Sequence, residues 1–301
     1  MHWKLKAYIQ KIVSALPLSA SLNYAMRRYV SRSLPVDDAT FQDMLVVAGK
    51  HYDYFLKNSP AESLQDPVFF EFGAGWDLIS QLYYHDRGIR RQCVVDIKPH
   101  AHLALINDTI KRLNRVGHIG GINSKKHINT VSNMSDLEQG CGIKYLAPCD
   151  MRRTGFPEAS FDFISSTATL EHIPAEDLAV ILAECRRLLK PNCCISCQID
   201  LKDHYSYYDR TISMYNFLKF SDSRWALYNS ALQFQNRLRY LDYVAMFQNA
   251  GFEIVECRPK KPTDADLALL KSLPIDSTFK NSFEDLGVKT LWLLARKAHN
   301  A

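Results

Sequence analysis

The chain has 301 residues, of which 47% are hydrophobic and 23% are charged. This balance is typical of a folded globular protein and argues against the disordered and fibrous classes. No apolar run reaches the ~20 residues that a membrane-spanning helix needs. The eight cysteines stand mostly in apolar surroundings, which argues against a disulfide scaffold and predicts a cytoplasmic location.

Residues 1–66 are predicted to form a helical extension. The net charge of +5 is uneven along the chain, because six basic residues precede the first acidic one, Asp37. Within residues 1–32, basic and apolar side chains alternate in a way that predicts a basic amphipathic helix. Such a helix packs on its own domain, or it meets an anionic membrane surface or substrate. We favour packing on the domain and keep peripheral membrane contact as an alternative.

Residues 67–301 are predicted to form one α/β domain. Short β-type runs alternate with helical stretches, which predicts a doubly wound, mostly parallel sheet with helices on both faces. The near-continuous apolar character of the strands agrees with burial on both sides. The seven predicted strands span residues 68–72, 93–97, 143–146, 161–165, 193–199, 252–257 and 288–295. The predicted helices span residues 77–85, 99–116, 174–190 and 240–250.

Two stretches interrupt this alternation. Residues 117–142 are polar and are predicted to be an irregular surface insertion. Residues 200–240 are rich in aromatic residues and are predicted to be a helical insertion that forms a lid or an acceptor pocket. The alternative is that these aromatic side chains form the insertion's own core. The candidate acceptor contacts are Trp76, Tyr207, Tyr208, Arg237 and Arg239.

The loop after the first strand carries most of the functional inference. It reads Glu71-Phe72-Gly73-Ala74-Gly75-Trp76-Asp77, and ligands of open α/β sheets bind at such strand ends. Gly73 and Gly75 permit a tight turn and a close approach of the backbone to a ligand. Asp77 is predicted to cap the helix that follows.

A dinucleotide site is the main competitor for this loop, so an NAD-dependent oxidoreductase stays open as an alternative. The dinucleotide motif needs a third glycine where this sequence has Leu78. Asp77 also places negative charge where a pyrophosphate would bind. The loop therefore favours a ligand with a sulfonium and an ammonium group, and Glu71 would attract the ammonium.

The second strand ends in an acid, in the sequence Val94-Val95-Asp96. A carboxylate at that position accepts hydrogen bonds from the two hydroxyls of a ribose. NAD and S-adenosylmethionine both carry such a ribose. The alternative is that Asp96 is a turn residue ahead of Pro99.

Taken in chain order, five motifs within residues 66–200 resemble those of class I S-adenosylmethionine-dependent methyltransferases. The motifs are Glu71–Asp77, Asp96, Cys149-Asp150-Met151, residues 161–173 and Leu188-Leu189-Lys190-Pro191. The resemblance implies a Rossmann-like methyltransferase domain, S-adenosylmethionine as the cofactor, and methyl transfer to another molecule. The sequence departs from the family pattern where Asp77 replaces the third glycine and Asn192-Cys193 replaces a pair of glycines.

The resemblance also implies the cofactor contacts. Gly73 and Gly75 would line the methionine part, and Asp96 would bind the ribose. Asp150 would bond the adenine amino group, with Met151 beside the ring. The residues implied to contact the cofactor are Glu71, Phe72, Gly73, Ala74, Gly75, Asp77, Asp96, Ile97, Asp150, Met151, Thr167 and Leu170.

Two histidines are candidates for the general base that an oxygen acceptor needs. His172 follows the strand at 161–165, and His204 follows the strand at 193–199. Each has a carboxylate neighbour in the sequence, and each lies where a strand end would bring it close to the cofactor. We favour His204, because its loop leads into the aromatic insertion.

No metal site is predicted. Cys193, Cys194 and Cys197 stand close together, but they lie in a predicted strand. No second pair of cysteines or histidines follows at the spacing of metal ligands. We therefore interpret these thiols as core residues.

The acceptor is predicted to be a small molecule or a glycan. Residues 203–205 and 236–240 are similar to stretches of bacterial methyltransferases encoded with surface-glycan machinery, which implies a sugar hydroxyl. A nucleic-acid substrate is disfavoured, because the basic charge is modest and no Asn/Asp-Pro-Pro-Tyr/Phe motif follows the strand at 161–165. A methyltransferase-like binding module without catalysis stays open, and the sequence does not predict the oligomeric state.

Overall fold

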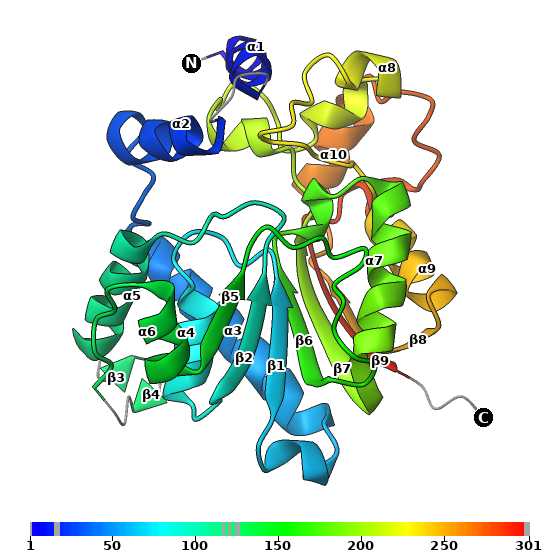
Figure 1. Cartoon of the computed structure of the whole chain (residues 1–301). Helices are drawn as coiled ribbons and strands as arrows, with labels where there is room; N and C mark the ends of the chain where they lie inside the picture. The colour runs from blue at the N-terminus through cyan, green and yellow to red at the C-terminus, as the bar shows by residue number, and fades with distance from the viewer. Residues whose placement is uncertain (1, 15–18, 116–117, 120–121, 124–126, 298–301) are drawn as a thin grey trace.

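A seven-stranded sheet forms the centre of the protein, in a computed structural model that describes residues 2–14, 19–115, 118–119, 122–123 and 127–297. Strand β9 runs antiparallel to both of its neighbours, and the other pairings are parallel (Figure 1). This confirms the predicted mostly parallel sheet. In spatial order the strands are β5 (Ile143–Leu146), β2 (Arg91–Val95), β1 (Val68–Phe72), β6 (Phe161–Thr167), β7 (Leu189–Asp200), β9 (Thr290–Lys297) and β8 (Phe252–Pro259).

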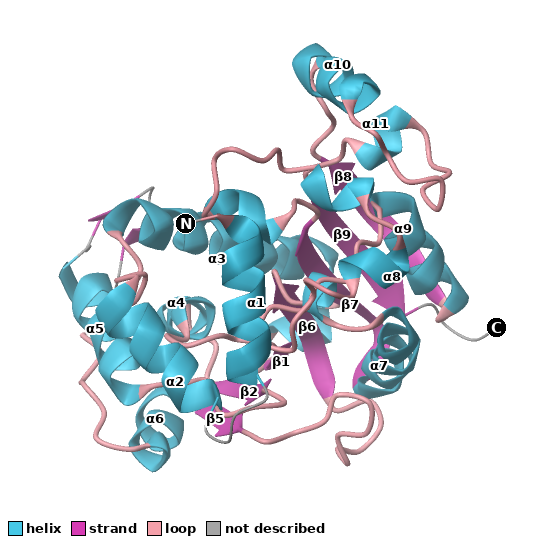
Figure 2. Cartoon of the chain, turned by 90° about the horizontal axis from the view of Figure 1, so that it is seen from above, coloured by secondary structure: helices cyan, strands magenta, loops and turns pink. Residues whose placement is uncertain are grey.

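Both faces of the sheet are buried, which explains the apolar strands. On β1, Phe69 and Phe70 point to opposite faces and belong to two separate core clusters. Helices α3 (Asp38–Asn58), α4 (Ile79–Asp86) and α5 (Leu103–Arg115) cover the face of Phe69. Helices α7 (Ala175–Leu188) and α9 (Tyr240–Asn249) cover the other face (Figure 2).

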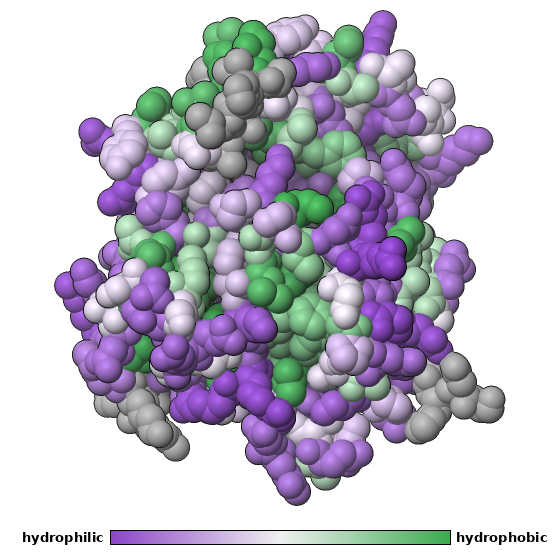
Figure 3. Space-filling view, in the orientation of Figure 1, coloured by the Kyte–Doolittle hydropathy of each residue, from purple (hydrophilic) through white to green (hydrophobic). Residues whose placement is uncertain are grey.

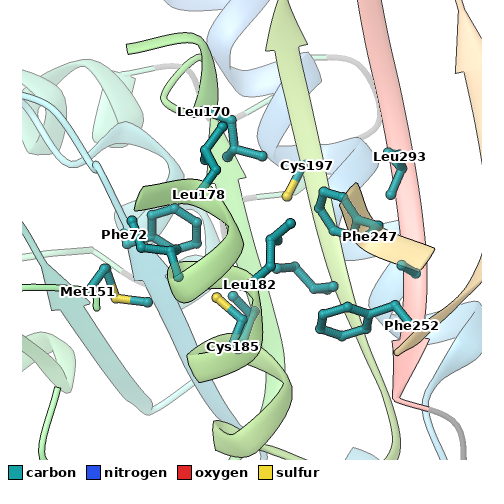
Figure 4. Close-up of a cluster of buried hydrophobic side chains, with 14 of the residues drawn as sticks. Phe72, Met151, Leu170, Leu178, Leu182, Cys185, Cys197, Phe247, Phe252 and Leu293 are labelled. Carbon is teal, nitrogen blue, oxygen red and sulfur yellow. The ribbon is translucent and has the colours of Figure 1, made fainter. Parts of the chain in front are cut away.

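Helix α7 shows how spacing in the sequence becomes packing. Five of its residues recur at intervals of three and four, so that they form one apolar stripe. All five are buried against the sheet, and Figure 4 shows Leu178, Leu182 and Cys185 beside Phe72. The stripe consists of Leu178, Ile181, Leu182, Cys185 and Leu188.

The predicted extension of residues 1–66 divides into two parts. Helix α3 packs in the core of the sheet, where buried His51 bonds Ser196 Oγ (2.7 Å) and Thr167 Oγ1 (3.1 Å). Helices α1 (Trp3–Ser14) and α2 (Ser19–Ala25), with the π-helix η1 (Met26–Val30), precede it. Figure 1 shows α1 and α2 above the carboxyl ends of the parallel strands.

Helix α1 packs on the aromatic insertion, as the favoured interpretation predicts. The buried Trp3 ring lies 5.5 Å from the ring of Tyr205 and 4.8 Å from that of Tyr228. Leu5 and Ile12 of α1 are exposed. Figure 3 shows hydrophobic (green) atoms at the top of the molecule, where Figure 1 labels α1. Among the described helices, none is long and apolar enough to cross a membrane.

The insertion at residues 200–240 is built from short helices around its own aromatic core. That core includes the buried Tyr215, Phe217 and Trp225. Helix α10 (Asp264–Ser272), which the sequence did not predict, adds Leu270 to the same core. The short helices of the insertion are η4 (His204–Tyr207), η5 (Asn216–Lys219) and α8 (Asp222–Trp225). Outside the insertion, α11 (Phe283–Leu286) adds Leu286 to the same core.

Several predicted boundaries were wrong. Helix α4 begins at Ile79, and its N-cap position is held by Leu78 in a left-handed conformation (φ 51°) rather than by Asp77. Helix α5 begins at Leu103 rather than 99. The insertion at 117–142, predicted to be irregular, contains helix α6 (Met134–Cys141) and two short strands. These strands are β3 (His118–Ile119) and β4 (Ile122–Asn123), and residues 116–117, 120–121 and 124–126 lie outside the described residues.

Candidate active site

The loop after β1 is joined to the ends of the neighbouring strands. The Gly73 amide donates to the Val95 carbonyl (3.1 Å) at the end of β2. On the other side, Thr169 Oγ1 donates to the Gly73 carbonyl (3.1 Å) and Ser166 Oγ to the Phe72 carbonyl (3.2 Å). The carboxyl ends of β1, β2 and β6 therefore form one site.

The two glycines of this loop have different reasons to be glycine. Both have a φ of +75°, in the left-handed region. A Cβ on Gly73 would lie 2.3 Å from the Thr169 side chain, so the close approach of the turn after β6 excludes any larger residue. A Cβ on Gly75 would meet nothing within 4 Å. The loop therefore borders open space at Gly75.

The predicted ribose and adenine contacts lie next to each other. The Cys149 amide donates to the Asp96 carbonyl (2.8 Å), which brings Asp150 and Met151 to the end of β2. Asp96 is buried, and Tyr145 donates its hydroxyl to the Asp96 carboxylate (2.9 Å). Ile97 is 60% exposed, although it is a large apolar residue. An exposed apolar side chain just after the end of β2 suits the face of a flat ring.

Three buried acids stand at the site, and a cationic ligand would stabilise their ionised form. Burial raises the pKa of Glu71 and of Asp96 to about 7, and that of Asp77 to about 6. Glu71 accepts a hydrogen bond from Ser165 Oγ (2.7 Å), a neutral donor. A carboxylate that is shielded from water and has only neutral hydrogen-bond partners favours a cationic ligand, because the ligand's positive charge stabilises the ionised form.

Aromatic residues of the N-terminal helices cover this loop. The Trp76 ring stacks with Tyr24 of α2 (5.6 Å, 30°), and Tyr24 stacks with His102 (4.2 Å, 10°). Arg27 lies near the same indole ring, 5.9 Å from its centroid. Trp76 therefore faces the N-terminal helices. Sequence reasoning missed Tyr24 and His102, because residues 78 positions apart carry no local signal of contact.

The two candidate histidines lie side by side at the ends of β6 and β7. The rings of His172 and His204 are 4.9 Å apart. His204 Nε2 lies 3.6 Å from Asp200 Oδ2, and Tyr207 stacks on the His204 ring (5.5 Å, 29°). The acidic partner is thus Asp200, four residues earlier. The sequence neighbour Asp203 instead accepts from the Tyr205 amide (2.8 Å).

Hydrogen bonding fixes the His172 ring. Its Nδ1 donates to the Phe234 carbonyl (2.6 Å), which leaves Nε2 as the atom with a free lone pair. Loss of solvent, and then the nearby His204, lower the pKa of His172 to about 4. The imidazole is therefore neutral near pH 7.

Glu171 is the buried neighbour of this histidine pair. It is 1% exposed, and burial raises its pKa well above the usual range. Its Oε1 accepts from the Asp200 amide (3.2 Å), whereas its Oε2 has no hydrogen-bond partner among the described residues.

Comparison with known proteins identifies the class of this site. Residues 71–197 match the family model described as a methyltransferase domain. Residues 71–197 therefore form a methyltransferase domain, and the protein is an S-adenosylmethionine-dependent methyltransferase. The matched range begins at Glu71 in the glycine loop and ends at Cys197 in β7.

Solved structures resemble this methyltransferase at low identity. Geranyl diphosphate C-methyltransferase from Streptomyces coelicolor is 15% identical, with a TM-score of 0.48, over 84% of this chain and 79% of the other. A Burkholderia thailandensis 1,6-didemethyltoxoflavin-N1-methyltransferase is 14% identical (TM-score 0.47), over 94% and 91% of the two chains. A Pyrococcus horikoshii protein is 10% identical (TM-score 0.49), over 90% and 97%. At this level they carry no functional argument, and no curated protein matches the chain.

The residues at the glycine loop fit S-adenosylmethionine, the cofactor of this methyltransferase. The open space beside Gly75, the exposed Ile97 and the three buried acids suit a ligand with a flat ring and two cationic groups. Two predicted contacts are placed differently. Phe72 (2% exposed) and Leu170 (0%) lie in the core beneath the loop (Figure 4), so only their backbones face the site.

Other predicted cofactor contacts are engaged with protein atoms. The Asp150 carboxylate is partly exposed and pairs with Arg152 (2.7 Å). Thr167 Oγ1 bonds His51 Nε2 (3.1 Å) and thus connects the end of β6 to α3.

The predicted acceptor contacts Arg237 and Arg239 are in fact buried, at 6% and 1% exposed. Arg237 donates to the Phe217 carbonyl (2.9 Å), and Arg239 to the Leu201 (2.9 Å) and Val288 (2.7 Å) carbonyls. Their charged groups satisfy backbone oxygens that would otherwise be buried without partners. They therefore hold the insertion of this methyltransferase together and do not face an acceptor.

Tyr207 and Tyr208 are half exposed, as acceptor contacts need to be. The Tyr207 hydroxyl donates to Asp200 and so stands beside the histidine pair. Lys6 of α1 covers the ring of Tyr208. Of the two tyrosines, Tyr207 is thus the one placed at the histidines.

Proposed function

We propose that this methyltransferase methylates a hydroxyl group of a small molecule or glycan, and that the group is a sugar hydroxyl. The observation that carries this proposal is the pair formed by His172 and His204, whose rings lie 4.9 Å apart at the strand ends. An oxygen nucleophile must lose a proton, and an imidazole beside the carboxylate of Asp200 is suited to assist that loss.

The cofactor is proposed to lie along the ends of β1, β2 and β6. When bound, it supplies an electrophilic methyl carbon, whose bond to sulfur breaks as the acceptor oxygen forms its new bond. Glu71 and Asp77 favour the cationic groups by charge, and Asp96 accepts from the ribose hydroxyls. The loop Gly73-Ala74-Gly75 lets the backbone approach, and Ile97 with Met151 contacts the adenine. Asp150 and the backbone of Thr167 complete the proposed contact set.

The acceptor is proposed to enter between the histidine pair and the exposed face of Tyr207. An exposed aromatic ring beside hydrogen-bonding groups is a usual platform for a sugar, because the ring face packs on C–H bonds while the edge groups bond hydroxyls. The similarity of residues 203–205 and 236–240 to glycan-associated methyltransferases supports the same acceptor class. The free state of all eight cysteines supports a cytoplasmic location.

The test is methyl transfer from S-adenosylmethionine to a panel of glycans and lipid-linked sugars. We expect His204→Ala and His172→Ala to lower turnover by 10²-fold or more, the range lost with a general base. Affinity for S-adenosylhomocysteine, measured by calorimetry, should stay unchanged. His127→Ala, at an exposed histidine, is the matched control. Full activity of both site variants, or transfer to a nitrogen or carbon acceptor only, would contradict the proposal.

A further inference from the structure

Glu171, His172 and His204 bring three metal-binding groups to one point. Each offers one ligand atom, and these atoms all lie within 4.8 Å of one another. They come from two separate segments, the turn after β6 and the start of η4 after β7. Ligands of a tetrahedral zinc ion, at about 2.1 Å from the metal, lie about 3.4 Å apart. Small side-chain movements would therefore complete the site.

A second observation points into the same cluster. Two of its buried side chains carry polar atoms without a hydrogen-bond partner among the described residues, Glu171 Oε2 and His204 Nε2. Glu171 is 1% and His204 is 9% exposed. An unpartnered polar atom in such a place costs free energy unless a ligand satisfies it.

The surroundings resemble the outer shell of a metal site. His172 Nδ1 donates to the Phe234 carbonyl, the bond that commonly orients a metal-binding imidazole. Asp200 lies 3.6 Å from His204 Nε2, and its amide donates to Glu171 Oε1. The Lys202 ammonium lies 3.5 Å from the other Asp200 oxygen, so Asp200 already has a partner of opposite charge.

We propose that Glu171, His172 and His204 bind one divalent transition-metal ion, which holds the acceptor hydroxyl. Two imidazoles and one carboxylate favour ions such as Zn²⁺ or Co²⁺ over Mg²⁺, which prefers oxygen ligands. The ion keeps an open position, because His172 is the exposed member of the cluster.

The role of the ion in holding the acceptor hydroxyl rests on the function proposed above. A hydroxyl bound to the ion becomes more acidic, so its O–H bond breaks and the proton passes to water. The electron pair left on oxygen is then free to bond the methyl carbon. In that case the two histidines act through the metal rather than as free bases.

Metal binding is tested directly on the full chain without a histidine tag. Protein treated with a chelator is dialysed against Zn²⁺, Co²⁺ or Mg²⁺, bound metal is counted by elemental analysis, and the Co²⁺ form is examined for its visible absorption bands. We expect one Zn²⁺ or Co²⁺ per chain, and no Mg²⁺. The conservative variants Glu171→Gln, His172→Asn and His204→Asn should each weaken binding at least tenfold, whereas His127→Asn should not.

Two controls keep the result clear. Unchanged affinity for S-adenosylhomocysteine shows that a variant that has lost metal binding is still folded. No metal on the wild-type protein, or equal binding by the three variants, would overturn the site. Full methyl transfer by the metal-free protein, together with loss of activity in His204→Asn, would overturn the metal's role and leave the proposed function standing. Metal binding without transfer to any hydroxyl would support the site and count against the proposed function.

Discussion

At the scale of single residues, Glu71 has the most direct consequence for stability. The carboxyl is buried, and burial raises its pKa to about 7, above the usual value of 4.5. Below pH 4.5 both the folded and the unfolded states hold the proton on Glu71, so the contribution of this residue to stability is fully present there. Between pH 4.5 and 7 the unfolded state ionises first. The contribution of Glu71 to the free energy of unfolding of the unliganded protein therefore falls as pH rises through this range.

We predict that Glu71→Gln flattens this dependence. The shift from 4.5 to about 7 corresponds to ~3 kcal/mol of unfolding free energy, at ~1.4 kcal/mol per pKa unit. Urea unfolding of the unliganded protein at pH 5 and pH 8 measures it. Glu138→Gln, at an exposed glutamate, should leave the dependence unchanged. If the unfolding free energy depends on pH equally in the wild type and in Glu71→Gln, the raised pKa of Glu71 is refuted.

The two loop glycines allow a second prediction, because they differ in what surrounds them. Gly75→Ala should cost about 1–2 kcal/mol of unfolding free energy for its left-handed backbone. Gly73→Ala should cost about 1–3 kcal/mol more, since its new methyl group collides with Thr169. Gly75→Ala should instead lower S-adenosylhomocysteine affinity at least tenfold, because the methyl group enters the proposed cofactor space. Urea unfolding and calorimetry measure the two effects, and equal losses in both variants would contradict this reading of the loop.

At the scale of elements, the apolar runs and their spacing predicted the sheet because burial on both faces leaves a strong pattern. The late start of α5 could not be predicted, since the residues before it make tertiary contacts such as that of the His100 amide with the Tyr145 hydroxyl (3.0 Å). Helix α10 did carry a local signal. Thr263 and Asp266 form a capping box, and a Thr three residues before an Asp is a sequence pattern typical of a helix start.

The part of the candidate site that follows the strand ends was predictable, whereas the partners of individual side chains were not. The glycine loop and Asp96 follow strands, so their meeting at one edge follows from the topology. The Asp200–His204 pair has a spacing of four, but it lies outside a regular helix and gives no clear signal. The prediction that Arg237 contacts the acceptor was wrong. The sequence shows that the residue is charged, but it does not show that backbone carbonyls surround the side chain.

We predict that Trp3→Ala releases α1 from the insertion. Truncating a buried tryptophan costs about 3–5 kcal/mol in a core, and Trp3 packs on rings of the insertion and not on the sheet. Amide hydrogen exchange of residues 3–14 should therefore become faster, while that of β1 and β6 stays slow. Leu5→Ala, at a side chain 54% exposed, is the control. Unchanged exchange in α1 of the Trp3 variant would show that other contacts hold the helix.

At the scale of the whole molecule, the N-terminal helices and the sheet meet over the cofactor loop. Tyr24 connects them, since it stacks on both Trp76 and His102. The extension is therefore expected to slow the exit of the cofactor, a role beyond its own packing.

We predict that Tyr24→Ala raises the dissociation rate of S-adenosylhomocysteine several-fold, with a smaller change in the association rate. Stopped-flow measurement of both rates checks this, and deletion of residues 1–32 should have at least as large an effect. Tyr29→Ala, at a side chain 72% exposed, is the matched control. Equal dissociation rates for the Tyr24 and Tyr29 variants would show that Tyr24 does not slow the exit of the cofactor.

The antiparallel strand β9 has a consequence for how the chain is made. It lies between β7 and β8, yet it is the last of the seven strands to leave the ribosome. Strands β1, β2, β5, β6 and β7 can pair during synthesis, whereas β8 has no neighbour until residues 290–297 appear. Until then the edges of β7 and β8 are open to other chains. A nascent chain paused between β8 and β9 is therefore the form of this protein most exposed to aggregation and most in need of a chaperone.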